Sequence, residues 1–132
     1  MKHYIIMFFI MILSGLLSTM NIWVDTPDYI RFSINDVYMV LLMSGWMFFF
    51  MGIVYRELTI FLLGFTFVII NIWCIRTQFM VTEMQYKLGM IPHHSMAVHM
   101  SKKLLQKENN NISPFVKNII KTQENEIIIL KQ

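Results

Sequence analysis

Charged residues are scarce in this sequence, and cysteine is nearly absent. Only 14% of the 132 residues are charged and 56% are hydrophobic, which is too apolar for an ordinary soluble domain of this length. The net charge of +3 is small, and the basic residues form no patch of the kind that binds nucleic acid. The single cysteine, Cys74, excludes an intrachain disulfide and any C-x-x-C motif. The composition therefore favours a membrane protein whose partner is the lipid bilayer, with no role in nucleic-acid binding.

The common signatures of catalysis are also missing. The sequence contains no recognisable nucleophile–base pair, no glycine-rich phosphate loop and no paired catalytic carboxylates. The long apolar segments carry no charged residue, so proton relays within a membrane find no support. We therefore expect a protein that is not an enzyme.

Three long apolar segments fill the first half of the chain. We expect membrane-spanning helices over residues 4–24, 37–55 and 58–75, since each has about the length that crosses a bilayer. The first segment could instead be a signal peptide, but it is long for one and has no clear small-x-small cleavage site. Small residues would let the second and third helices approach closely. They are Ser44, Gly45, Gly52 and Gly64.

The basic residues set the expected orientation. Lys2 and Arg56 would share one side of the membrane, and the acidic connection over residues 25–36 would lie on the other. The positive-inside rule then places everything after Arg76 on the non-cytoplasmic side. Lysines further along the chain argue for the opposite orientation, but those far from the membrane count for less. We expect a multi-pass membrane domain over residues 1–76 with an external C-terminal domain.

Residues 89–100 form the chemically distinctive stretch, because three of the four histidines lie in it. Gly89 suits the end of one helix, and Pro92 suits the first position of the next. On a helix over residues 92–107, imidazole and thioether groups recur at a spacing of three and four and share a face. We expect His99, beside two lysines, to be solvated.

The donors in this stretch suggest a soft metal ion. The candidate ligands are His93, His94, Met90, Met96 and Met100. Imidazole nitrogen and thioether sulfur together suit copper(I) better than calcium or magnesium, and another transition metal is the alternative cofactor. Methionine and alanine at helical spacing are equally compatible with a packed core.

The C-terminal domain over residues 77–132 is expected to contain three helices. Besides residues 92–107, these cover residues 77–88, as an extension of the third span, and 114–131, with Ser113 as N-cap. A loop at residues 108–111 would join the last two. Such a short domain is marginal for a core of its own, so it needs a third surface, either the extension of the third span or a second copy. Two copies would form a four-helix bundle around the metal. We therefore expect an all-α homodimer.

The last helix places an amide in an apolar seam. Gln123 lies among apolar residues spaced by three and four, and Glu126 follows on nearly the same side. Gln123 could hydrogen-bond the far ring nitrogen of a ligating histidine, or it could fix the helix register. Gln123 and Glu126 are therefore candidate second-shell or secondary ligands.

A family resemblance rests on the same residues. The run Met90-Ile91-Pro92-His93-His94, followed by Ala97 and Met100 and by Gln123-x-x-Glu126-Ile127, resembles the family called domain of unknown function 305. The resemblance implies a ferritin-like helical fold rich in histidine and methionine, with copper binding and resistance in some members. It covers about residues 78–132, and three preceding apolar segments are typical of a membrane-anchored subgroup. Leu130 stands where the family usually has a methionine, so this chain lacks that sulfur.

A second set of methionines lies within the apolar segments. Met39, Met43, Met47 and Met51, here named the methionine stripe, recur every four residues and wind slowly around the expected helix. The stripe could pass copper(I) along the membrane. It could equally serve helix–helix packing with a flexible side chain.

Three functions follow from these observations. The leading hypothesis is a small membrane protein that binds copper(I) in an external His/Met domain, for metal tolerance or delivery. The second is a structural or interaction protein that binds no metal. The third is metal conduction along the methionine stripe.

Overall fold

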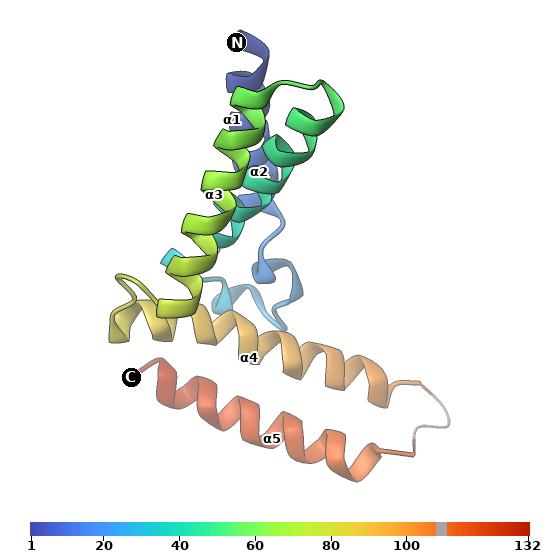
Figure 1. The fold of residues 1–132 in the computed structure, drawn as a ribbon. Coiled ribbons are helices and arrows are strands. Elements are labelled where there is room, and N and C mark those ends of the chain that lie inside the picture. Colours follow the sequence, from blue (N-terminus) through green and yellow to red (C-terminus); the bar gives the residue numbers. More distant parts are fainter. Residues whose placement is uncertain (108–110) are drawn as a thin grey trace. The chain divides into compact units, whose positions relative to one another are not determined.

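The computed structural model describes residues 1–107 and 111–132 and is helical throughout them, with no strand (Figure 1). This confirms the all-α prediction. The described elements, in order, are α1 (Lys2–Leu17), η1 (Met20–Trp23), η2 (Pro27–Tyr29), α2 (Ile34–Val54), α3 (Leu58–Thr77), α4 (Glu83–Leu105) and α5 (Ser113–Leu130). Part of the expected loop, residues 108–110, lies outside the described residues. Two compact units form, one from residues 1–19 and 34–81, the other from 20–33 and 82–132.

The first unit contains α1, α2 and α3, the helices that could span a membrane. Three segments are long and apolar enough to cross a bilayer, namely Lys2–Trp23, Ile34–Val54 and Leu58–Thr77, as the sequence predicted. Helices α2 and α3 run antiparallel and pack along their length (Figure 1). Their backbones meet at the expected small residues: a Cβ added to Gly64 would lie 2.2 Å from the Phe49 backbone nitrogen, and one added to Gly52 would lie 2.3 Å from that of Phe61. Glycine is what allows this close approach.

Two boundaries in this unit differ from the prediction. The first span is not one α-helix over residues 4–24, because α1 ends at Leu17 and the chain continues as the short helix η1. Ser18 and Thr19 lie at the break, where short hydroxyl side chains compete for backbone hydrogen bonds.

The third span does not extend into residues 77–88, which corrects the second expectation. Gln78 and Met80 adopt left-handed backbone conformations with φ of 52° and 55°. The turn is held by the Tyr38 hydroxyl, which donates to the Phe79 carbonyl oxygen at 2.6 Å, and by the Asn35 amide, which donates to Gln78 Oε1 at 3.2 Å. Contacts from α2, distant in sequence, therefore end α3 at Thr77.

The second unit is built on one long helix, where the sequence predicted two. Helix α4 runs unbroken from Glu83 to Leu105, so Gly89 does not end a helix and Pro92 does not begin one. Pro92 lies inside α4, where it removes one backbone hydrogen bond. The true start is capped by Thr82, whose side chain accepts a hydrogen bond from the Gln85 backbone N–H at 3.3 Å. The sequence Thr82-x-x-Gln85 is a capping box, which is a local signal for a helix start at this point. The prediction based on Gly89 and Pro92 did not include it.

Helix α5 folds back antiparallel along α4 (Figure 1). Ile91 and Val98 of α4, with Val116 and Ile127 of α5, form the buried apolar core of this unit. Ser113 is the first residue of α5, not its N-cap as expected, and Ile112 holds the cap position without a side-chain hydrogen bond.

The connection between the first two spans completes this unit. Residues 20–33, including η1 and η2, pack against α4. This contribution was not expected from a domain confined to residues 77–132. The short α4–α5 hairpin thereby gains a third surface, which the sequence analysis assigned to a second copy or to an extension of the third span.

Candidate functional site

The two adjacent histidines of α4 face different surroundings. His93 is exposed to solvent, whereas His94 is turned toward α5 and its side chain is only 12% exposed. Their ring centroids are 6.0 Å apart. An imidazole nitrogen binds a metal at about 2 Å, so rings at this separation can share one ion after side-chain rotation.

His94 is paired with the carboxylate predicted to assist it. Its Nδ1 atom lies 2.8 Å from Glu126 Oε2, which joins α4 to α5. Nδ1 is buried and has no aligned hydrogen bond among the described residues, so its approach to Glu126 is a close contact and not a formed hydrogen bond. A carboxylate this close favours the ring tautomer with the proton on Nδ1 over the one with a lone pair there. The Nε2 lone pair is then available to a metal, as in carboxylate–histidine–metal arrangements.

The candidate methionines lie on the open side of α4. Met100 is exposed, and Met90 and Met96 are half-buried. Met90 precedes the two histidines by three and four residues, which makes it their neighbour one turn away. Met96 and Met100 continue the same surface toward the end of α4. His93 and the three thioethers are therefore at least partly accessible to solvent, whereas His94 faces α5.

Gln123 does not have the predicted contact. It is half-buried on α5, and no hydrogen bond described for residues 1–107 and 111–132 joins it to His93 or His94. Glu126, one turn further on, makes the histidine contact instead. The role of Gln123 and Glu126 as second-shell or secondary ligands stays a prediction.

A polar network beside the histidines was not predicted. The Lys102 ammonium lies 2.7 Å from the carboxylate of Asp25, in the connection between the first two spans, and 3.1 Å from the carboxylate of Glu124. The Asp25 backbone N–H donates to the hydroxyl of the fully buried Ser95 at 2.8 Å. Hydrogen bonding to Asp25, and then to Glu124, raises the pKa of Lys102. These contacts hold residues 20–33 and α5 against α4.

His99 belongs to the edge of this network. Its Nδ1 atom lies 3.9 Å from Asp25 Oδ1 and its side chain is 35% exposed, so His99 is only partly solvated. The covering residue is 74 positions earlier in the chain, and no local pattern connects the two. Pairing of Lys102 with Asp25 could not be read from helical spacing for the same reason.

The methionine stripe is not an enclosed path in one chain. Met39 and Met43 are 51% and 43% exposed, and Met47 and Met51 are half-buried. Those exposed side chains project from the outer surface of α2, where they would meet lipid or another protein. Metal conduction along the stripe stays a prediction.

The described residues form no group of three or more histidine, cysteine, aspartate or glutamate side chains that could hold a metal. Cys74 is free and buried in α3, in the other unit.

A family model and a viral protein match the chain. Residues 77–132 match the model for a domain of unknown function, DUF305. The chain is also 43% identical over 123 residues to a protein of Acanthamoeba polyphaga mimivirus described as uncharacterized protein L153, covering 86% of this chain and 79% of that protein. No solved structure is significantly similar to the chain.

Proposed function

This chain belongs to the family of the mimivirus protein L153 and carries a DUF305 domain, and on that premise we propose that it binds copper(I) at a membrane through α4. The observation that carries the proposal is the approach of His94 Nδ1 to Glu126 Oε2 at 2.8 Å. Such a carboxylate fixes the ring and directs its other nitrogen toward a metal.

The ligand chemistry supports a soft ion. His93 and His94 supply imidazole nitrogen, and Met90, Met96 and Met100 supply thioether sulfur on neighbouring turns of α4. Thioethers select copper(I) and disfavour magnesium and calcium. The Glu126–His94 contact would position the ring, and the exposed His93 would close on the ion. The chain would retain the ion for tolerance or pass it on, and it would carry out no reaction on it.

A second copy is the proposed completion of the site. The donor surface of α4 is at least partly open, because His93 and Met100 are exposed. Burying two such surfaces against each other would surround the ion with donors from both chains, in the manner of metal sites inside four-helix bundles. We therefore propose a homodimer in the membrane.

The proposed location follows from the count of spans. Residues 20–33 follow one crossing and residues 82–132 follow three, so both would emerge on the same side of a bilayer. Their membership of one compact unit agrees with three crossings. With Lys2 and Arg56 inside, this unit would lie on the non-cytoplasmic side.

The proposal is tested by competition between the detergent-purified protein and a copper(I) chelator. The wild type should bind copper stoichiometrically, and the double variant His93→Ala/His94→Ala should not. Glu126→Gln should weaken binding about 10- to 100-fold, as loss of such a positioning carboxylate does. His99→Ala is the matched control, since it removes an imidazole from the same helix but not from the proposed site.

Two further measurements separate positioning from folding. The ¹⁵N shifts of the His94 ring should report a proton on Nδ1 in the wild type and a mixture of tautomers in Glu126→Gln, with unchanged helix content. Light scattering in detergent should give a dimer. A wild type that retains no transition metal would overturn the proposal and favour an interaction protein without metal.

A further inference from the structure

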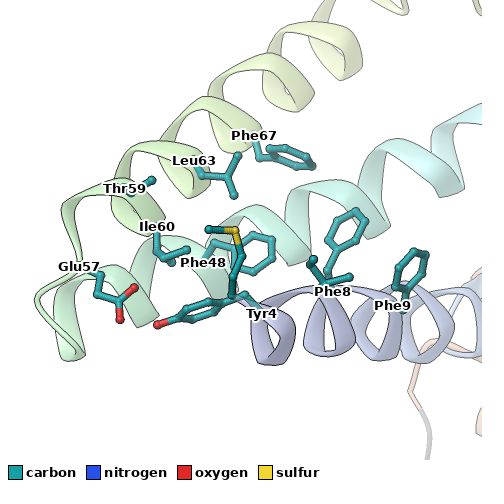
Figure 2. A pocket seen from close by; sticks show the side chains of 11 residues that line it. Tyr4, Phe8, Phe9, Phe48, Glu57, Thr59, Ile60, Leu63 and Phe67 are labelled. Carbon is teal, nitrogen blue, oxygen red and sulfur yellow. The ribbon is translucent and has the colours of Figure 1, made fainter.

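A cavity of about 580 Å³ lies within the membrane-spanning unit, among α1, α2 and α3 (Figure 2). Its walls are aromatic and aliphatic, with Phe8 from α1, Phe48 from α2 and Leu63 and Phe67 from α3. The ring of Phe8 lies 5.9 Å from that of Phe48 and 6.0 Å from that of Phe67, centroid to centroid. The volume is within the range of small-ligand sites, about 300–1,000 Å³.

Polar groups gather at one end of this cavity. Figure 2 shows the Tyr4 hydroxyl and the Glu57 carboxylate pointing toward each other there, with Thr59 nearby. Glu57 is the residue before α3 begins, so it lies at the end of a span, at the depth of lipid head groups. Its carboxylate is the one acidic group among the lining side chains, and none of them is basic.

The cavity opens toward the surrounding bilayer. Only 6% of the first candidate span is buried, which makes α1 the most loosely packed of the three helices. Ile5 and Phe9 line the cavity from α1 and are each more than half exposed. A hydrocarbon chain could therefore enter sideways from the membrane, without passing through water.

We propose that this cavity binds one membrane lipid that carries an ammonium in its head group. Its acyl chain would lie along the cavity wall formed by Phe8, Leu63 and Phe67. The ammonium would lie beside the carboxylate of Glu57 and near the ring of Tyr4, since charge pairing and cation–π attraction both favour a cation there. Lys2 and Arg56 lie on the same side of the membrane but do not line the cavity, so inside it the Glu57 carboxylate would disfavour an anionic head group.

The preference can be measured by native mass spectrometry of the full chain. The protein is reconstituted with equal amounts of phosphatidylethanolamine and phosphatidylglycerol that have identical acyl chains, and the lipid retained after detergent exchange is counted. We expect phosphatidylethanolamine to be enriched about three- to fivefold, the preference that one exposed charge contact provides. Glu57→Gln should reduce this ratio to about one and leave a lipid bound.

Two controls isolate the cavity. Asp36→Asn also removes a carboxylate from this unit, but Asp36 does not line the cavity and its variant should keep the preference. Leu63→Trp should fill the cavity and reduce retained lipid severalfold, whereas Ile69→Trp, at an exposed position of α3 outside the cavity, should not. Circular dichroism checks that each variant keeps its helices.

Several results would overturn the inference. Equal retention of the two lipids by the wild type would remove the role of Glu57, and enrichment of phosphatidylglycerol would show recognition by basic residues. Retention unchanged in a helical Leu63→Trp variant would mean that the lipid binds elsewhere. If Leu63→Trp does not fold, the ratio of phosphatidylethanolamine to phosphatidylglycerol retained by Glu57→Gln tests the inference by itself. None of these results depends on copper binding.

Discussion

Replacing Gly64 by alanine should push α3 away from α2 in the first unit. The new Cβ would lie 2.2 Å from the backbone nitrogen of Phe49, whereas ordinary contacts begin at 3.4 Å. The added Cβ would therefore be 1.2 Å closer than an ordinary contact, and a backbone atom cannot rotate away as a side chain can. Helix α3 would therefore move about 1 Å from α2 near this position.

Such a displacement is large for packed helices. A gap of 0.5–1 Å already removes about a quarter to a half of the dispersion energy of each contact. Overpacking of well-packed interiors typically costs about 1–3 kcal/mol, and we expect Gly64→Ala to lower the free energy of unfolding by about 2–3 kcal/mol. Unfolding in mixed micelles by denaturing detergent, followed by circular dichroism, measures this change.

Gly15→Ala is the matched control for this prediction. Its added Cβ would meet the side chain of Val40 at 2.8 Å, and no backbone atom is among its nearest neighbours. It should cost less than Gly64→Ala, by about 1 kcal/mol or more. If the two variants are equally stable, α2 and α3 are not held together by backbone contact at Gly64 and the reasoning fails.

Three further predictions concern the second unit. Thr82→Ala should destabilise α4 by about 0.5–2 kcal/mol, because it removes the N-cap hydrogen bond, and faster amide exchange in the first turn would show it. Pro92→Ala should stabilise α4 by about 1–3 kcal/mol, since alanine restores a backbone donor inside the helix, and a lower melting temperature would contradict this. Lys102 has a raised pKa, so its contribution to stability should be complete below about pH 10 and should disappear as the pH rises through its folded value. The contribution should be under about 1 kcal/mol because the side chain is 41% exposed, and Lys102→Met should remove this alkaline loss.

Apolar length alone predicted three helices that could span a membrane, because about 20 uncharged residues have few other stable arrangements. The small residues predicted the close packing of α2 and α3 for a similarly local reason, since glycine at the contact is a requirement of geometry. The end of α3 was mispredicted because contacts from Tyr38 and Asn35, some 40 residues earlier, hold the turn after Thr77.

The candidate site was predicted unevenly for related reasons. Spacing placed Glu126 on the face of α5 that meets α4, and the structure brings it to His94. Pro92 was misread as a helix start, because its preference for the first turn is a statistical rule and α4 tolerates it inside. Asp25 was missed altogether, since its partners lie 70 and 77 positions away and only tertiary structure brings them together.

The central claim is that histidine and methionine of α4 bind copper(I) together. X-ray absorption at the copper edge of the loaded, detergent-purified protein tests it most directly. We expect copper(I) with a mixed shell of nitrogen and sulfur, and loss of the sulfur contribution in the triple variant Met90→Leu/Met96→Leu/Met100→Leu. A shell of nitrogen and oxygen alone, unchanged in that variant, would contradict the claim.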